Sequence, residues 1–164
     1  MREIKFRGKT IDRFNKNHVS KWVYGCLIET KPNKVDGEWS AYIMERPTFI
    51  PSKTIPVEKF IEVDFKTVGQ FVGLTDKHGK EIYEGDIIKN NWHNINGKSI
   101  GCVWVVKFGE HQTSEDFYAC SAYGWYGEAK NGETHTLHDL PSDGEYDVEI
   151  IGTVHEHPEL IKYK

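Results

Sequence analysis

Apolar and polar residues alternate along much of this chain with a period of two. The clearest examples are residues 21–29 (KWVYGCLIE) and 99–108 (SIGCVWVVKF). Such alternation is typical of strands in a sheet that buries one face. Further strands are predicted around Ile4 and Phe6 and over residues 39–46, 67–74, 81–89, 116–127 and 147–156. The segment 116–127 is expected to pair with 99–108.

Turn-forming residues separate these segments. Within 75–80 (TDKHGK), Asp76 can hydrogen-bond to its own backbone and Gly79 can adopt a positive φ, which predicts a tight turn. Gly85-Asp86 predicts a bend, and Asn96-Gly97 is a strong signal for a hairpin turn. Gly25, inside a predicted strand, indicates a bulge or a close approach of another backbone.

Short strands with glycine turns favour small curled sheets or a barrel, because no segment keeps a helical period. The prolines at 47, 51 and 56 indicate a connector or an edge segment. We therefore predict a mainly β fold with little helix, apart from one helical turn near residues 157–160. A β-rich part over 1–60 and a small barrel over 61–164 are expected to pack into one compact unit, since neither is long enough for a large core.

Composition narrows the class of protein. The chain has 164 residues, 13% of them aromatic, and three cysteines. It has no apolar run of the length that spans a membrane and no apolar core of a signal peptide after its first residues. We expect a cytoplasmic globular protein with no membrane partner and no disulfide framework.

Charge is distributed unevenly around the total of −4. Residues 1–34 hold nine Lys or Arg and three Asp or Glu, a net +6, whereas residues 110–164 hold three and twelve, a net −9. We favour attraction between the two ends, within one chain or between subunits. The alternative is a nucleic-acid site on the basic head, formed by Arg2, Lys5, Arg7, Lys9 and Arg13. Stacking could come from Trp22 beside Lys21, or from Trp104 near Lys107.

Catalytic and metal motifs are absent from the sequence. There is no phosphate-binding loop, no GxSxG, no HExxH and no CxxC, so neither a catalytic residue nor a metal or cofactor is predicted. The histidine pairs 135/138 and 155/157 are expected to lie at the surface. The cysteines at 26, 102 and 120 are expected to act as small core residues. Glu84 and Asp86 could share a strand face as a hydrolase pair, although an Asp after Gly at a bend more commonly bonds backbone amides.

The segment 67–88 (TVGQFVGLTDKHGKEIYEGDII) resembles the signature of the YopX family, and residues 1–7, 22–25 and 151–160 also match that family. The resemblance implies a small β-rich protein, encoded mostly by tailed bacteriophages and prophages of Gram-positive bacteria, that often self-associates and whose biochemical function is not established. It supplies no catalytic residues. The family has Tyr and Asn at the positions of His155 and His157, which argues against a shared metal site. The central block, strand, turn, strand and bend, has the elements that a small SH3-like barrel needs.

These observations predict a non-enzymatic phage accessory protein in the cytoplasm of a bacterial host. It is expected to form a homo-oligomer and to interact with phage or host proteins. Nucleic-acid binding is the alternative, and a hydrolase using Glu84 and Asp86 is the second alternative.

Overall fold

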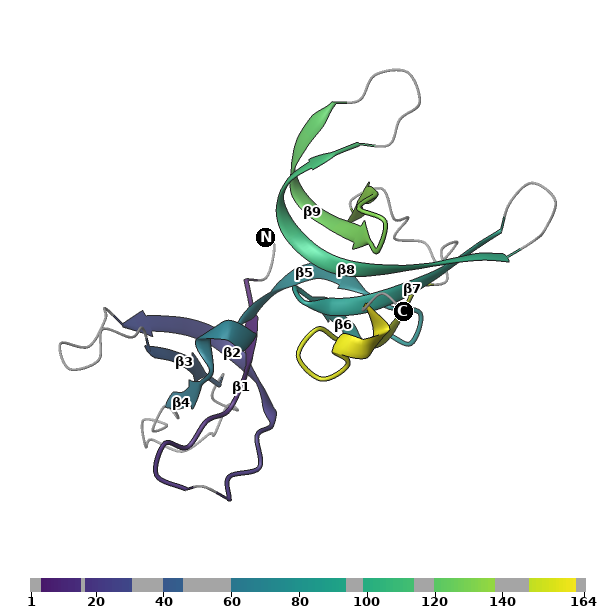
Figure 1. The fold of residues 1–164 in the computed structure, drawn as a ribbon. Coiled ribbons are helices and arrows are strands. Elements are labelled where there is room, and N and C mark those ends of the chain that lie inside the picture. The colour runs from purple at the N-terminus through teal and green to yellow at the C-terminus, as the bar shows by residue number, and fades with distance from the viewer. Residues whose placement is uncertain are drawn as a thin grey trace. The chain divides into compact units, whose positions relative to one another are not determined.

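The computed structural model describes residues 4–15, 17–30, 40–45, 60–93, 99–113, 120–137 and 148–161. Most of these residues lie in antiparallel strands, and the helical segments are short 3₁₀ turns, so the prediction of a mainly β fold with little helix is confirmed. The chain forms two compact units, Met1–Phe71 and Val72–Lys164 (Figure 1). The predicted turn at Asn96-Gly97 and the proline-containing segment 47–56 lie outside the described residues.

The first unit is an antiparallel sheet built from short strands. These are β1 (Phe6–Lys9), β2 (Trp22–Thr30), β3 (Ser40–Met44), β4 (Phe60–Val63) and the first residues of β5 (Gly69–Thr75). Their order is β4-β3-β2-β1-β5. A 3₁₀ turn, η1 (Phe65–Thr67), connects β4 to β5. The strands predicted around Phe6, over 21–29 and over 39–46 are therefore confirmed.

One face of this sheet forms the core of the first unit. Its buried side chains are Val23, Ala41, Ile43 and Val63. The backbone packs closely at Gly25, where a Cβ atom would lie 2.1 Å from the carbonyl oxygen of Met44 on the neighbouring strand. Gly25 therefore marks a close approach of two backbones, as one of the two sequence expectations proposed.

The second unit contains a five-stranded antiparallel sheet with the order β10-β9-β8-β7-β11. A further strand, β6 (Glu81–Tyr83), pairs with β5 at the end of the strand order β4-β3-β2-β1-β5-β6. The five strands are β7 (Asp86–His93), β8 (Ser99–Gln112), β9 (Ser121–Ala129), β10 (Thr134–Thr136) and β11 (Val148–Thr153). The expected pairing of 116–127 with 99–108 is confirmed in part: β8 pairs with β9 from Trp104 opposite Ala129 to Gln112 opposite Ser121, and residues 116–119 lie outside the described residues. The core of this unit contains Val72, Ile82, Ile88, Trp104, Val106, Leu137 and Val148.

The predicted turns of the central block are present. Asp76 Oδ1 accepts hydrogen bonds from the backbone N–H groups of His78 and Lys80, and Gly79 has a φ of 78°. Gly85, with a φ of 80°, separates β6 from β7, so the segment 81–89 forms two strands. The helical turn expected near the C-terminus is the 3₁₀ segment η3 (Pro158–Leu160).

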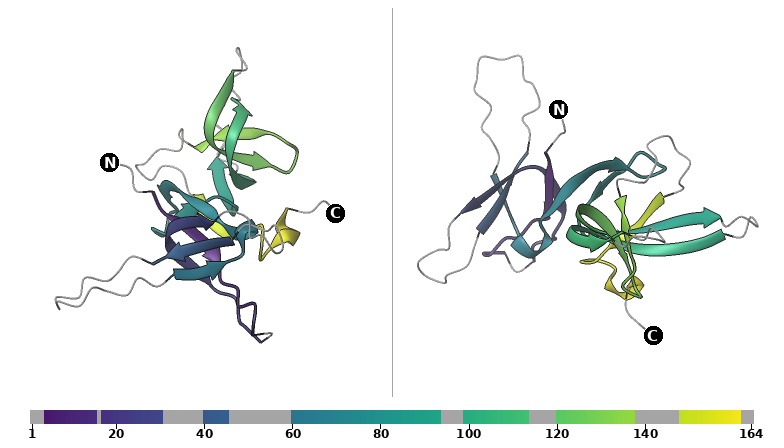
Figure 2. Two further views of the ribbon diagram at one scale, coloured as in Figure 1. Left: turned by 90° about the vertical axis from the view of Figure 1, so that its left-hand side faces the viewer. Right: turned by 90° about the horizontal axis from the view of Figure 1, so that it is seen from above.

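The hairpin of β8 and β9 bends strongly (Figure 2). The hydroxyl of Thr134, on β10, donates to the carbonyl oxygen of Gln112 (2.7 Å), and His111 Nε2 lies 2.8 Å from Thr136 Oγ1. Side-chain hydrogen bonds thus connect the end of β8 to β10. The strand pairings of the described residues leave both sheets open, so the SH3-like barrel is not confirmed.

Candidate functional site

A row of cations lies along one face of β1 in the first unit. The Arg7 guanidinium carbon lies 4.5 Å from the ring centre of Trp22, and Lys9 Nζ lies 5.7 Å from the same ring. Lys5 Nζ lies 6.0 Å from the ring centre of Tyr24. The arrangement follows from strand geometry: residues 5, 7 and 9 project to one face, and the register sets Lys9 opposite Trp22 and Arg7 opposite Tyr24. We call these five residues the cation–aromatic face.

The structure therefore brings together three of the five residues predicted for the basic head. Arg13 lies in the segment after β1, where its Nε donates to Glu62 Oε1 of β4 at 2.9 Å. Arg2 lies outside the described residues. Arg7 is only 4% exposed, whereas Tyr24 is 41% exposed. The accessible part of the face therefore includes the ring of Tyr24, which was not among the predicted residues, and excludes most of Arg7.

The second stacking candidate was wrong. Trp104 is 4% exposed and belongs to the core of the second unit. Lys107 forms an ion pair with Glu128 of β9. In the strand register, residues 104 and 107 project to opposite faces of β8, which is why proximity in the sequence did not bring them together.

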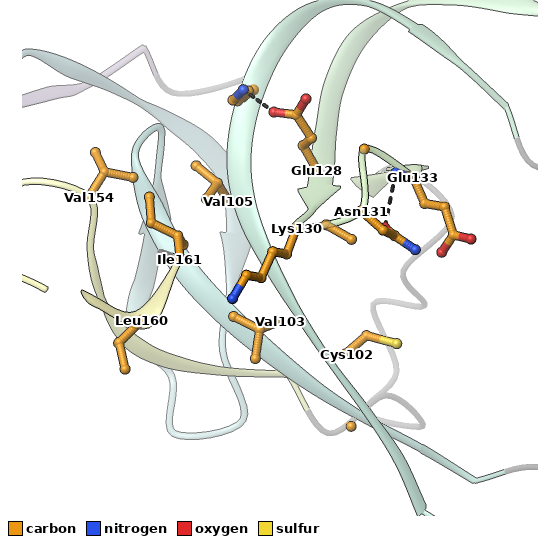
Figure 3. Close-up of a pocket in the computed structure, with 14 residues that line it drawn as sticks. Cys102, Val103, Val105, Glu128, Lys130, Asn131, Glu133, Val154, Leu160 and Ile161 are labelled. Carbon is orange, nitrogen blue, oxygen red and sulfur yellow. Dashed lines mark hydrogen bonds and ion pairs between the residues drawn. The ribbon is translucent and has the colours of Figure 1, made fainter. Parts of the chain in front are cut away.

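A groove of about 950 Å³ runs over the second unit on the face of β8 that carries Val103 and Val105 (Figure 3). Its walls are the C-terminal segment, which includes Leu160 and Ile161, and the turn between β9 and β10. Apolar side chains form the floor, and Figure 3 shows Lys130 reaching over it from the β9–β10 turn. Such a groove provides apolar contact with a charged rim.

Three aromatic side chains gather on the β8–β9 hairpin, and we call them the aromatic patch. Phe108 lies 4.8 Å from Trp125 and 5.2 Å from Tyr123 between ring centres, the second contact being edge to face. Phe108 is 47% exposed and Tyr123 is 76% exposed. The Nε1 atom of Trp125 is buried without a hydrogen-bond partner among the described residues. These aromatic residues could not be distinguished from core residues by sequence, because the alternation around them is the same.

The carboxylates of the central block stabilise the turns. Asp86 is 0% exposed, and its Oδ2 accepts the backbone N–H of Tyr83 at 2.8 Å. Asp76 Oδ2 accepts the backbone N–H of Ile150, on β11, at 3.3 Å in addition to the two bonds within its own turn. Burial by itself would raise the pKa of Asp76, but the hydrogen bonds from Lys80, His78 and Ile150, together with the charge of His78, lower it below its ordinary value.

Histidine and cysteine side chains do not gather in the part of the chain that the structure describes: no group of three His, Cys, Asp or Glu there could hold a metal ion. His138 lies outside that part. Cys26 and Cys102 are partly buried, but Cys120 is exposed, so the expectation that it is a core residue was wrong. His111, which the sequence did not single out, is buried and stacks on Tyr126 at 4.7 Å between ring centres.

The described residues define a mainly β protein with two antiparallel sheets. The family model described as YopX protein matches residues 13–162, which is nearly the whole chain. The chain belongs to the YopX family, as the sequence resemblance indicated. No curated protein matches it significantly. The helical turns among the described residues are too short to cross a membrane.

Proposed function

We propose that this protein is a phage or prophage accessory protein that acts by binding, assembles with copies of itself and catalyses no reaction. Membership of the YopX family supports the phage origin, and with it a place of action in the cytoplasm of a bacterial host. Its partners beyond its own copies would be phage or host proteins.

The aromatic patch is the observation that carries the proposal. Aromatic side chains are enriched at the centres of protein interfaces, where their rings bury a large area at a small cost in conformational entropy. The pairing of β7 with β8 ends at Ile87 and Val105, and the Val106 carbonyl oxygen accepts the N–H of Gly85. Between Val106 and Gln112, whose carbonyl oxygen accepts the Thr134 hydroxyl, the described strand that pairs with β8 is β9. An accessible strand edge beside exposed rings favours association between protein chains.

Two further observations bear on the proposed class. The hydrogen bonds that connect the end of β8 to β10 support a relation to small SH3-like barrels, which bind through loops and strand edges. The buried carboxylate of Asp86, bonded to the Tyr83 amide, supports a structural role for that residue over a hydrolase pair with Glu84.

Sedimentation velocity at micromolar concentration tests self-association. We expect the wild-type protein to sediment as an oligomer, and the double variant Phe108→Ser/Tyr123→Ser to dissociate at concentrations at least about 30-fold higher, since aromatic residues central to an interface contribute about 2 kcal/mol or more. Phe14→Ser is the matched control, because Phe14 is 100% exposed and belongs to the first unit.

A wild-type protein that remains a monomer throughout this range would refute self-association. An oligomer that the double variant leaves intact would show that the aromatic patch is not the interface. Circular dichroism of each variant establishes that the fold is retained.

A further inference from the structure

The cation–aromatic face lies in the first unit and has no part in the proposed interface. Arg7 and Lys9 occupy alternate positions along β1, Lys5 directly precedes that strand, and Trp22 and Tyr24 occupy alternate positions along β2. Alternate residues of a strand are about 6.6 Å apart, and neighbouring strands are about 4.8 Å apart. Because Arg7 is buried, the accessible part of this face consists of the exposed ring of Tyr24 and the partly exposed Trp22, Lys5 and Lys9.

A ligand that matches this face has negative charges for the two lysines and planar groups that can stack on the ring of Tyr24. Single-stranded nucleic acid has both, because its phosphates follow the backbone and its unpaired bases expose their faces. An acidic peptide provides the charges without the rings. A duplex keeps its bases stacked inside and offers only its phosphates to such a face.

The individual contacts assign different roles to the members of the face. Tyr24 has the accessible ring, whereas Arg7 is almost fully buried against Trp22 and therefore orients that ring and adds positive potential. Lys5 and Lys9 are partly exposed on either side of Arg7. The surrounding segment strengthens the attraction, since residues 1–34 hold nine Lys or Arg against three Asp or Glu in a chain whose total charge is −4.

We propose that the cation–aromatic face binds single-stranded nucleic acid, with Lys5 and Lys9 contacting phosphates and one base stacking on Tyr24. The contacts are made to the backbone and to the ring face, so binding depends weakly on base sequence. This function is separate from self-association.

Fluorescence anisotropy of a labelled oligothymidylate of about 20 nucleotides, titrated with the full-length protein between about 50 and 200 mM salt, tests the proposal. We expect salt-sensitive binding that is tighter than binding to a duplex of equal length. Tyr24→Leu should weaken binding roughly 5- to 140-fold, the range measured for loss of one stacked base, whereas Tyr24→Phe should bind like the wild type.

The lysines are tested by the salt dependence. The double variant Lys5→Gln/Lys9→Gln should reduce the slope of log affinity against log salt by about 1.4, because each phosphate contact on a single strand contributes about 0.7. Arg13→Gln is the control: it removes one positive charge from the first unit, against two in the lysine variant, at a residue that pairs with Glu62 of β4 and is not part of the cation–aromatic face, so the slope should stay the same.

Several results would overturn the proposal. Wild-type protein that binds no oligothymidylate at the lowest salt excludes the site, whatever the variants do. Equal affinity for the duplex, or equal losses for Tyr24→Leu and Tyr24→Phe, excludes stacking on Tyr24. A change in slope for Arg13→Gln as large as that for the lysine variant would show that general charge is responsible and not this face.

Discussion

Asp76 offers the sharpest test of how this fold is stabilised. Its carboxylate accepts three backbone N–H groups: those of His78 and Lys80 at 2.9 Å, and that of Ile150 on β11 at 3.3 Å. The backbone N–H of Lys77 also donates to Val148 of β11 at 2.9 Å. Asp76 therefore stabilises the turn after β5 and also connects that turn to β11, an edge strand of the five-stranded sheet.

Asp76→Asn retains the shape of the side chain and removes its charge. Hydrogen bonds to a charged group contribute about 1.5–3 kcal/mol, against about 1 kcal/mol for neutral groups, and the new NH₂ group would face a backbone donor. Since the residue is 7% exposed, water can compensate little of this loss. We expect the free energy of unfolding at pH 7 to fall by about 2–3 kcal/mol.

The pH dependence gives a second, independent readout. The pKa of Asp76 is lowered in the folded protein, so the carboxylate contributes stability above its ordinary pKa, and this contribution is lost as the pH falls through the folded value. Below that value the wild-type side chain is also uncharged. The difference between wild type and Asp76→Asn should therefore be full at pH 7 and shrink once the pH falls below about 4.

Urea unfolding followed by circular dichroism at several pH values measures both effects. Asp12→Asn is the control, because the Asp12 carboxylate also accepts two backbone N–H groups, from Phe14 and Asn15, but lies exposed at the surface. Its effect should stay within about 0.5 kcal/mol. A loss in Asp76→Asn that is the same at pH 7 and at pH 3, or no loss at all, would refute the role assigned to the charge.

Two further substitutions, measured by urea unfolding at neutral pH, test the backbone packing of the first unit and an ion pair of the second. Gly25→Ala should lower the free energy of unfolding by about 1–3 kcal/mol, since the added Cβ would lie 2.1 Å from the carbonyl oxygen of Met44 and must push β2 and β3 apart. The control Gly124→Ala has no atom within 4 Å of its added Cβ and should change this free energy by less than about 0.5 kcal/mol. Equal effects of the two substitutions would contradict the close approach at Gly25. Lys107→Met should lower the free energy of unfolding by less than about 1 kcal/mol, because Lys107 and its partner Glu128 are both partly exposed to solvent. A loss above about 2 kcal/mol would contradict this exposure of the pair.

Local chemistry made much of the fold predictable. The strands over 21–29 and 99–108 follow from alternation, and the turn at Asp76 and Gly79 follows from the capacity of these residues to close a turn. Two elements escaped prediction for physical reasons. β4 (Phe60–Val63) is only four residues long, and β10 (Thr134–Thr136) has no apolar residue, so its strand conformation depends on pairing with β9.

The candidate sites were less predictable because they depend on register and on which face is buried. Trp22 and Trp104 have similar neighbours in the sequence, and both alternate with apolar residues. Trp22 lies against the cations of β1, whereas Trp104 is buried in the core of the second unit. The choice is made by what packs on each side of the strand, which local sequence does not specify.

The sequence by itself determined that this protein is built from short strands and glycine turns, that it belongs to the YopX family and that its positive charge is concentrated near the N-terminus. These properties reside in side-chain alternation, in the φ values open to glycine and in counts of charge, which need no distant contact. Only the tertiary structure decided that Lys5, Arg7 and Lys9 share a face with Trp22 and Tyr24, that Arg13 pairs with Glu62 and that Phe108 and Tyr123 of the aromatic patch are exposed. Each of these depends on strand pairing between residues separated along the chain, and that pairing is fixed by burial of the sheet as a whole.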